Sequence, residues 1–369
     1  MANSFLTPSI IGKEALMILE NELVAANLFH RGHADEFKGA KVGDTISIRG
    51  PASFTAQEFT STVTTQDATE SSRSLQLEKH FDTTFAVTSK QWSLNLEDFK
   101  TQLLTPAIVS IAQAIDSYIL GKGIQVPNFV GTATDPPDSL ADLTAVVKKL
   151  DDLKVPQRGR IGIVDSQAKH DMLNISNVIQ ADQRGQAGVT AMQEASMGRI
   201  MGLDYYMDQN VASHTAATLA DYLVNDASAA IGDTTVTIDG GSGTIKAGDL
   251  FTIAGDSTQY VVLTTNGSTS MTIQETGLVV AAANNAAITF QSNSTHVVNL
   301  AGHGDGITYA IVPLELPAGA ARAEYVADRG LGLRIVFDYS ASTKTDTISL
   351  DVLCGAKVQQ GDLLTRVFG

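Results

Sequence analysis

The stretch from Asn95 to Gly121 has the longest helical pattern in the sequence and constrains the fold more than any other. Its apolar residues recur every three or four positions, which places them on one face of a helix. That face contains Leu96, Phe99, Leu103, Ala107, Ile111, Ala114, Ile115 and Tyr118. Asn95 is a suitable N-cap and Gly121 a suitable C-terminal stop. A helix of this length spans roughly 35–40 Å, so a large partner surface is needed to cover its apolar face.

Pro106 lies in the middle of this helical pattern. Proline has no backbone N–H, and its ring clashes with the preceding turn of a helix. We therefore expect the helix to bend at Pro106 or to lose one hydrogen bond there.

The composition is that of a folded, acidic protein. The chain has 369 residues, 43% of them hydrophobic, and a formal net charge of -15. This length predicts two or three domains with sizeable cores. An acidic chain gains nothing from the counterion release that drives binding to nucleic acid, so a role in reading DNA sequence is disfavoured.

The sequence contains a single cysteine, Cys354, within a pattern that alternates like a strand. One cysteine excludes an internal disulfide and any multi-cysteine metal site, and we expect a buried structural thiol. The N-terminus lacks a basic region followed by an apolar core, so we expect no signal peptide. We also expect no membrane span, which needs about 20 consecutive apolar residues.

The N-terminal region predicts a helix over residues 7–29 with Thr7 as N-cap. Because this helix precedes every other element, it could pack on a neighbouring subunit or on its own domain, and the sequence leaves both possibilities open. The four potential metal ligands His30, His33, Asp35 and Glu36 follow it. Their spacing fits no standard zinc motif, which favours a solvated loop.

Two alternating patterns, over residues 41–49 and 75–87, predict antiparallel strands with one covered face. Residues 50–74 between them are rich in Ser and Thr and include Phe54 and Phe59. This segment is too long for a tight turn, so we expect an extended hairpin that projects from the body. A projecting hairpin cannot bury its own aromatic side chains, and we expect another chain to cover them.

The region after the long helix predicts mixed helices and strands. Ser139 and Asp142 form a capping box at the start of a second helix. Further predicted elements are strands at 160–164 and 201–207, a short helix near 167–173 and a loop over 180–190. The C-terminal part predicts strands at 296–300, 307–313, 333–339, 346–353 and 363–368.

Residues 224–292 differ from their surroundings, since Lys246 is the only Lys or Arg between Arg199 and Arg322. Short β segments alternate with glycine-containing turns over this stretch, a spacing typical of a small barrel or sandwich. Strands resume after it, so we interpret 224–292 as a β domain inserted into a loop of a larger α+β domain.

No pattern in the sequence marks an active site. A nucleophile elbow, a P-loop and an H-E-x-x-H motif are absent, and the seven histidines are scattered. One Gly-Asp turn recurs, at Gly43-Asp44, Gly248-Asp249 and Gly361-Asp362. Glycine supplies a positive φ and aspartate bonds its own backbone, so we interpret this turn as the entry to a strand. We expect no catalytic residue, cofactor or metal.

The order of these parts resembles that of a major capsid protein of the tailed bacteriophages. The resemblance divides the chain into an N-terminal arm (1–40), an extended loop with peripheral strands (41–94), a spine helix (95–124), an α+β core (125–223 and 293–369) and the insertion (224–292). Within this group, the sequence most resembles the coat proteins of short-tailed phages that carry an inserted β-barrel. Two stretches carry that resemblance: Lys246-Ala-Gly-Asp-Leu-Phe-Thr-Ile-Ala-Gly255 and Arg199-Ile-Met-Gly-Leu-Asp-Tyr-Tyr. The insertion is shorter than that subfamily implies.

The resemblance implies a structural protein that assembles through itself, as hexamers and pentamers, into an icosahedral shell around double-stranded DNA. It also implies a scaffolding protein, a portal and a place in the virion after assembly in the host cytoplasm. Contacts between subunits are then expected at Phe54, Phe59, Arg49, Phe5 and Leu19. Two alternatives are an encapsulin-like nanocompartment shell and a secreted β-rich surface protein. The long helix and the lack of a signal peptide argue against the second.

Overall fold

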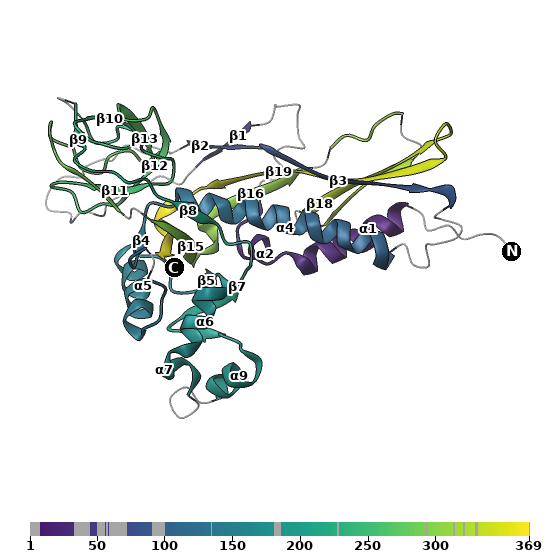
Figure 1. Cartoon of the computed structure of the whole chain (residues 1–369), viewed down its shortest axis with the longest axis horizontal. Coiled ribbons are helices and arrows are strands. Elements are labelled where there is room, and N and C mark those ends of the chain that lie inside the picture. Colours follow the sequence, from purple (N-terminus) through teal and green to yellow (C-terminus); the bar gives the residue numbers. More distant parts are fainter. Residues whose placement is uncertain are drawn as a thin grey trace. The chain divides into compact units, whose positions relative to one another are not determined.

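The computed structural model describes residues 8–32, 45–49, 56, 58, 72–90, 100–133, 135–180, 186–226, 229–291, 294–312, 314–319, 322–328 and 331–368. The chain divides into two compact units, each made of several segments. Unit 1 contains residues 1–22, 31–112 and 308–359, and unit 2 contains residues 23–30, 113–307 and 360–369. Most elements of the two units are labelled in Figure 1.

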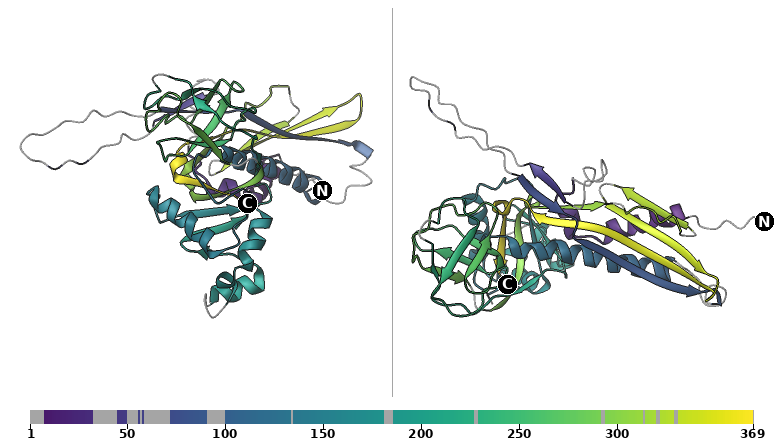
Figure 2. Two further views of the ribbon diagram at one scale, coloured as in Figure 1. Left: turned by 60° about the vertical axis from the view of Figure 1, so that its left-hand side comes forward. Right: turned by 90° about the horizontal axis from the view of Figure 1, so that it is seen from above.

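A five-stranded sheet is the centre of unit 1. Its strands are β16 (Ile307–Val312), β19 (Thr345–Val358), β18 (Leu331–Ser340), β17 (Arg322–Asp328) and β3 (Lys79–Thr88). They follow the order β16-β19-β18-β17, and β3 pairs with β19 over ten residues, from Thr88 opposite Thr345 to Lys79 opposite Cys354. The long strands β3, β18 and β19 lie side by side in Figure 2. Cys354 is buried in β19, as its alternating pattern predicted.

Helix α1 (Pro8–Glu22) packs against β17 and β18. Ala15, Leu16 and Leu19 of α1 are buried. The approach is close at Gly12, where an added Cβ would overlap Val326 of β17. Of the two placements that the sequence left open for this helix, the structure therefore shows packing on its own chain.

The predicted hairpin begins as the antiparallel pair β1 (Thr45–Arg49) and β2 (Ser72–Gln76). Ile46, Ile48 and Leu75 are buried in a small cluster that also includes Ala310. The single strand predicted over 75–87 is wrong, because the chain forms two strands. Strand β2 pairs with β1, whereas β3 starts at Lys79 and pairs with β19. The partner therefore changes between Gln76, the last residue of β2, and Lys79, the first residue of β3.

The predicted spine helix consists of three consecutive helical segments: a π-helical turn, η2 (Lys100–Leu104), the helix α4 (Thr105–Gly121) and a 3-10 turn, η3 (Lys122–Gln125). The predicted start at Asn95 lies outside the described residues. Pro106 is the second residue of α4, so it does not lie in the middle of the helix. The expected hydrogen-bond irregularity occurs as the π turn directly before it. A wider turn accommodates the missing N–H and the bulk of the ring.

By length and composition, the helical run Gln102–Gln125 is apolar enough to cross a membrane. Half of the most apolar 18-residue stretch in this helical run is buried inside the chain. Core helices of soluble proteins have the same character, and α4 contributes Ile108, Ile111, Ile115 and Ile119 as almost fully buried side chains.

Unit 2 is built on a mixed seven-stranded sheet of order β4-β20-β15-β5-β7-β6, with β8 paired to β15. Its strands are β4 (Phe129–Val130), β20 (Leu364–Phe368), β15 (Thr295–His303), β5 (Arg160–Val164), β7 (Leu203–Met207), β6 (Arg199–Ile200) and β8 (Ser213–Thr215). The pairs β4–β20 and β5–β7 are parallel. Strand β15 runs antiparallel to β20, β5 and β8, and β6 runs antiparallel to β7.

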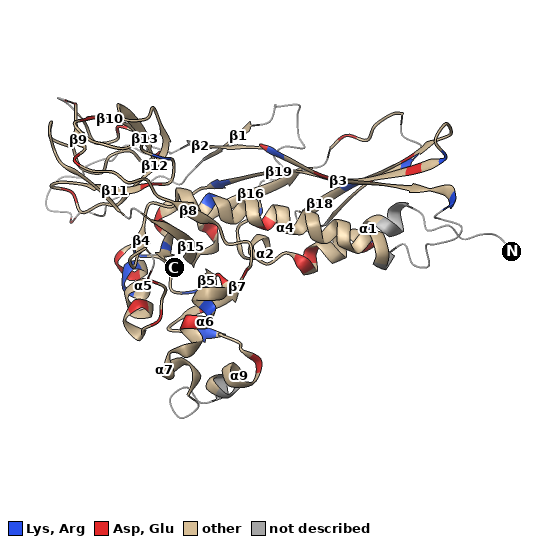
Figure 3. Cartoon of the chain, in the orientation of Figure 1, with Lys and Arg blue, Asp and Glu red and all other residues tan. Residues whose placement is uncertain are grey.

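Besides η3 and the second half of α4, the described part of unit 2 contains α2 (Ala25–Leu28), α5 (Leu140–Asp152), α6 (Ser166–Asn174), α7 (Ser176–Ile179) and α9 (Gln186–Glu194), with 3-10 turns η4 (Gly304–Gly306) and η5 (Gly361–Leu363). The predicted capping box of α5 is confirmed, since Ser139 Oγ accepts from the Asp142 N–H and Asp142 accepts from the Ser139 N–H. Charges of both signs lie along α5 in Figure 3. The loop predicted over 180–190 is wrong from Gln186 onward, where α9 begins.

The stretch that the sequence singled out forms a six-stranded antiparallel sheet of order β14-β11-β12-β13-β10-β9. The strands are β9 (Leu223–Val224), β10 (Thr235–Asp239), β11 (Leu250–Ile253), β12 (Tyr260–Thr265), β13 (Ser270–Ile273) and β14 (Ile288–Gln291). The two edges nearly meet, because Val224 N donates to Ala286 O at 3.0 Å and Ile288 N to Tyr222 O at 2.9 Å. We call residues 220–291 the barrel.

The barrel has its own apolar core. Sixteen buried residues form this cluster, among them Tyr222, Val236, Phe251, Tyr260 and Val262; fourteen lie in the barrel, and Ala217 and Leu219 lie just before it. The ring of Phe251 stacks on Tyr260, with centroids 5.6 Å apart. Full burial of one such side chain contributes about 1.5–3 kcal/mol, so the barrel has the apolar burial that a small β domain needs.

Candidate functional site

The base of the barrel holds the most deeply buried set of charged and titratable side chains in the described part of unit 2. Arg366 of β20, Asp249 before β11, His214 of β8 and His296 of β15 are all at least nine-tenths buried. We call these four residues the base cluster. They come from parts of the chain up to 152 residues apart (214 to 366), so only the folded chain brings them together.

Arg366 is fully buried, and its guanidinium donates to three backbone carbonyls. Its Nε donates to Val126 O at 2.7 Å, its Nη1 to Gly248 O at 3.0 Å, and its Nη2 to Ile124 O. The planar guanidinium thus joins the chain after α4 to the barrel turn at Gly248. Burial lowers the pKa of Arg366 to about 9, and the charge of Asp249 opposes this shift. The side chain remains charged at neutral pH.

Asp249 organises the same turn from the other side. Its Oδ2 accepts from the Lys246 N–H at 2.8 Å, and its Oδ1 accepts from the Ala217 N–H at 3.2 Å. Because an ionised carboxylate only accepts, His214 Nε2 donates to Oδ1 across 3.0 Å. Gly248 has a φ of +96°, and a Cβ there would overlap Ile124 Cγ2. The Gly248-Asp249 turn, which the sequence pattern assigned to strand entry, therefore also joins the barrel to His214, Ala217 and Ile124 outside it.

The other two Gly-Asp turns differ from this one. Gly43-Asp44 lies outside the described residues. Gly361 opens the 3-10 turn η5 without a positive φ, so the positive φ predicted for the recurring turn is correct at Gly248 and wrong at Gly361.

His296 completes the base cluster. It lies opposite His214 in the β8–β15 ladder, with ring centroids 5.5 Å apart, and its ring meets Phe368 edge-on at 4.4 Å. Its Nδ1 bonds the carbonyl of Ser294 at 3.3 Å, whereas its Nε2 is buried without a hydrogen-bond partner. Burial, together with nearby His214 and Arg366, lowers the pKa of His296 to about 4. The ring is therefore neutral at pH 7.

Asp116 of α4 is a second buried carboxylate with a structural role. Its Oδ2 accepts from the Val24 N–H at 2.8 Å and its Oδ1 from the Ala26 N–H at 2.9 Å. These bonds cap the N-terminus of α2, which has no local side-chain cap. Burial raises the pKa of Asp116 to about 6, although the backbone hydrogen bonds act in the opposite direction.

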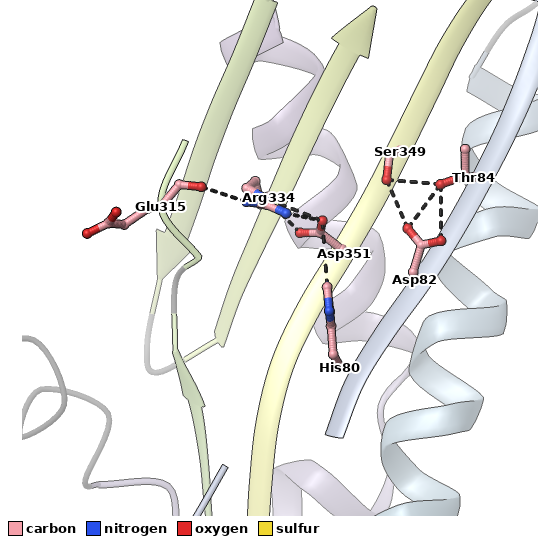
Figure 4. Close-up of polar contacts among 7 residues, drawn as sticks. All are labelled: His80, Asp82, Thr84, Glu315, Arg334, Ser349 and Asp351. Atoms are coloured by element: carbon pink, nitrogen blue, oxygen red, sulfur yellow. Dashed lines mark hydrogen bonds and ion pairs between the residues drawn. The ribbon is translucent and has the colours of Figure 1, made fainter. Parts of the chain in front are cut away.

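In unit 1, a polar network crosses strands β3, β19 and β18 (Figure 4). Arg334 Nε donates to Asp351 Oδ1 at 2.9 Å, and its Nη1 donates to the carbonyl of Glu315 at 2.6 Å. His80 Nε2 lies 3.7 Å from Asp351 Oδ2. The buried carboxylate of Asp351 thus has partners on both neighbouring strands. Beside it, Asp82, Thr84 and Ser349 bond one another within 3.1 Å.

Within the described residues, no group of three or more His, Cys, Asp or Glu side chains is arranged to hold a metal ion. His30 lies 3.6 Å from Asp305 at the edge of unit 2. The other three residues of the histidine-rich loop, His33, Asp35 and Glu36, lie outside the described residues.

Comparisons with known proteins place the fold. No protein-family model matches the sequence, and no curated protein matches it. Among solved structures, a chain of Mycobacterium phage Che8 is similar, with a TM-score of 0.54 and 12% identity over 94% of this chain and 90% of that one. The capsid of cyanophage P-SCSP1u matches 89% of this chain and 84% of its own at 10% identity, with a TM-score of 0.49. The capsid of Ralstonia phage GP4 matches 89% of this chain and 84% of its own at 9% identity, with a TM-score of 0.48.

The fold is the phage capsid fold. The expected α+β architecture is confirmed, and the stretch predicted as a small barrel or sandwich forms one nearly closed sheet. At 12% identity, the similarity to the Che8 chain establishes the fold of this chain and not a subfamily of capsid proteins.

In terms of the capsid fold, the five residues predicted at subunit contacts fall into three groups. Phe5, Phe54 and Phe59 lie outside the described residues. Arg49 ends β1, where its backbone is paired with Ser72. Leu19 is fully buried within its own chain, so we withdraw it from the expected contacts. A one-sided apolar stripe in α1 could not show which chain covers it, and here β17 and β18 do.

The sequence patterns gave no indication of the base cluster as a group. Gly248 and Asp249 are recognisable as turn residues, but His214, His296 and Arg366 carry no local signal. An arginine within the apolar C-terminal strand, Leu-Leu-Thr-Arg-Val-Phe, is the one available hint, since a charge inside a buried strand requires partners.

Proposed function

We propose that this chain is the major capsid protein of a tailed phage, a structural protein whose copies form an icosahedral shell around double-stranded DNA. The observation that carries the proposal is the match to the Che8 chain over 94% of this chain. A match over nearly the full length leaves little of the chain for a separate catalytic domain. The sequence also lacks catalytic motifs, which supports a role without enzymatic activity.

The β1–β2 pair supports self-assembly on physical grounds. Ile46, Ile48 and Leu75 of this pair are buried within the chain, but the segment between the strands carries the aromatic residues Phe54 and Phe59, which a projecting hairpin cannot bury by itself. Contacts with neighbouring subunits, through Phe54, Phe59, Arg49 and Phe5, would supply the missing burial. Closed shells of identical chains are built from such repeated contacts, here as hexamers and pentamers.

The net charge of -15 supports a shell that encloses DNA without binding it in a sequence-specific way. An acidic wall repels packaged DNA and leaves it mobile. Scaffolding and portal proteins are the further partners that this function requires. The protein would assemble in the host cytoplasm and remain in the virion, with no membrane involved. A nanocompartment shell is the alternative on the same fold, and the inserted barrel argues against it.

We also propose the division of the chain that this function implies: an arm (1–40), an extended loop with peripheral strands (41–94), a spine helix (95–124), an α+β core (125–223 and 293–369) and an inserted domain (224–292). The apolar core of the barrel ends at Ile288, which supports the boundary at 292, whereas its residues Ala217, Leu219 and Tyr222 lie before 224.

Negative-stain microscopy of the purified protein, with light scattering, tests the proposal. Shells or capsid-like intermediates of MDa size are expected, alone or with a co-expressed scaffold. A stable monomer at every salt and protein concentration, with and without scaffold, would overturn it. Shells that contain a protein cargo in place of DNA during infection would favour the nanocompartment.

A further inference from the structure

The base cluster lies where the barrel meets the sheet of unit 2. Apolar contacts also join them, because Leu250 and Val261 of the barrel pack with Phe368 and Phe129. A hydrogen bond also joins them: the backbone N–H of Phe129 donates to the side-chain oxygen of Gln259 in the barrel at 3.0 Å. The barrel therefore rests on an interface with one apolar part and one buried polar part.

The polar part surrounds His296 with groups that can carry charge. Arg366 contributes a positive charge at neutral pH, while the ring of His296 is neutral. These are the titratable groups that face His296: His214 on β8, Asp249 in the barrel turn and Arg366 on β20. The apolar ring of Phe368 also packs against His296.

A proton on His296 has no acceptor in this arrangement. Its Nδ1 already bonds the Ser294 carbonyl, and its Nε2 is enclosed without a partner. A new positive charge would lie beside Arg366, and the nearest carboxylate, Asp249, is already bound to His214 and two backbone N–H groups. A buried charge without a partner is strongly unfavourable, so protonation must be relieved by opening the cluster to water.

We propose that the base cluster is an acid-sensitive latch: protonation at His296 opens the interface between the barrel and the sheet, while the strands of the barrel stay folded. Separate cores make such partial opening possible. Fourteen of the sixteen residues in the apolar cluster lie within the barrel, and none of the four base-cluster residues belongs to the cluster, so the barrel keeps this core when the base opens. The latch is a property of the single chain and does not depend on the proposed function.

Hydrogen exchange on the unassembled full-length chain tests the latch, at pH 7.5 and pH 4.5, with rates corrected for the chemical effect of pH. The reporter amides are Phe129, bonded to Gln259, and Ala217, bonded to Asp249. The reference amides are Ile238 and Ile273, which bond within the barrel to Thr269 O and Thr234 O. Relative to pH 7.5, the corrected exchange rates of the reporter amides should rise more than tenfold at pH 4.5, and up to roughly 80-fold if His296 regains its ordinary pKa on opening. The corrected rates of the reference amides should change less than about twofold.

Two variants make the test specific. His296→Phe cannot be protonated and extends the apolar contact with Phe368, so its reporters should change less than about threefold between the two pH values. His296→Gln serves the same purpose if the phenylalanine variant fails to fold at pH 7.5. His303→Gln is the matched control, since His303 lies on the same strand outside the base cluster, and it should behave like the unmodified chain.

Three outcomes would overturn the proposal: reporter exchange that does not rise at pH 4.5, a rise that persists in both His296 variants, or a rise of equal size in the reference amides. The last result would mean that acid unfolds the barrel as a whole and that no separate interface opens.

Discussion

Oδ2 of Asp116 lies 2.8 Å from the backbone nitrogen of Val24, across 92 positions of sequence. With the second bond, from Ala26, it supplies the helix cap that the local sequence of α2 lacks. A cap of this kind contributes about 1 kcal/mol. Here burial also makes the carboxylate sensitive to pH.

The first prediction concerns this carboxylate. Its pKa is raised from 3.8 to about 6, so its contribution to the unfolding free energy is fully present below pH 3.8 and is lost as the pH rises through 6. The difference between the two limits is at most about 3 kcal/mol. Asp116→Asn should remove this part of the pH dependence between pH 4 and 7. Urea unfolding of both proteins over that range provides the measurement, and identical pH profiles would contradict the assignment.

The second prediction concerns the backbone at Gly248. Gly248→Ala should destabilise the chain by about 2–4 kcal/mol, because a left-handed residue would gain a Cβ that overlaps Ile124 Cγ2. Gly255→Ala is the matched control: its φ of +91° is similar, but nothing lies within 4 Å of the added atom. It should lose only about 1 kcal/mol. Equal losses in thermal unfolding would show that close approach at Gly248 is unimportant.

The third prediction separates two carboxylates that face each other on paired strands, Asp351 and Asp82. Asp351 is 4% exposed and holds Arg334 through three short contacts. Asp351→Ala leaves this partly buried arginine without its carboxylate partner and should lower the unfolding free energy by about 3–5 kcal/mol. Asp82→Ala removes an exposed network and should lower it by less than about 1 kcal/mol. Denaturant titration measures the unfolding free energy of both variants. A larger decrease for Asp82→Ala than for Asp351→Ala would contradict this prediction.

The fourth prediction addresses assembly. Phe54→Asp and Phe59→Asp should prevent shell formation while the monomer remains folded, since both place a charge where we propose apolar contact between subunits. Ala56→Asp is the control, because Ala56 is exposed in the same segment and contributes no aromatic surface. Microscopy and circular dichroism measure assembly and folding separately. Normal shells from both phenylalanine variants would refute the role of this loop.

The fifth prediction concerns the barrel as a domain. A fragment of residues 216–292 contains every residue of the barrel's apolar core, from Ala217 to Ile288. It should fold alone into a β structure with a cooperative thermal transition. A random-coil circular dichroism spectrum would show that the barrel requires the base cluster to fold, and would also weaken the proposed latch.

Local patterns were enough to predict several elements of this chain. The alternation of Ile46 and Ile48 determined the buried face of β1, and Ser139 with Asp142 determined where α5 begins. Each of these signals depends on residues within a few positions of one another, and backbone geometry connects such residues directly. The order of elements along the sequence likewise indicated the capsid fold.

The tertiary structure alone decided which chain covers Leu19, where the strand predicted over 75–87 changes partner, and what His296 and Arg366 contact. An apolar helix face or an alternating strand pattern indicates that a surface is buried, but it does not indicate which other part of the protein covers that surface. A buried charge states that partners exist, yet Arg366 finds them at Gly248 O, 118 positions away. Because such contacts are set by how distant segments pack, the sequence determined the elements and their order, and the packing of those elements determined the base cluster.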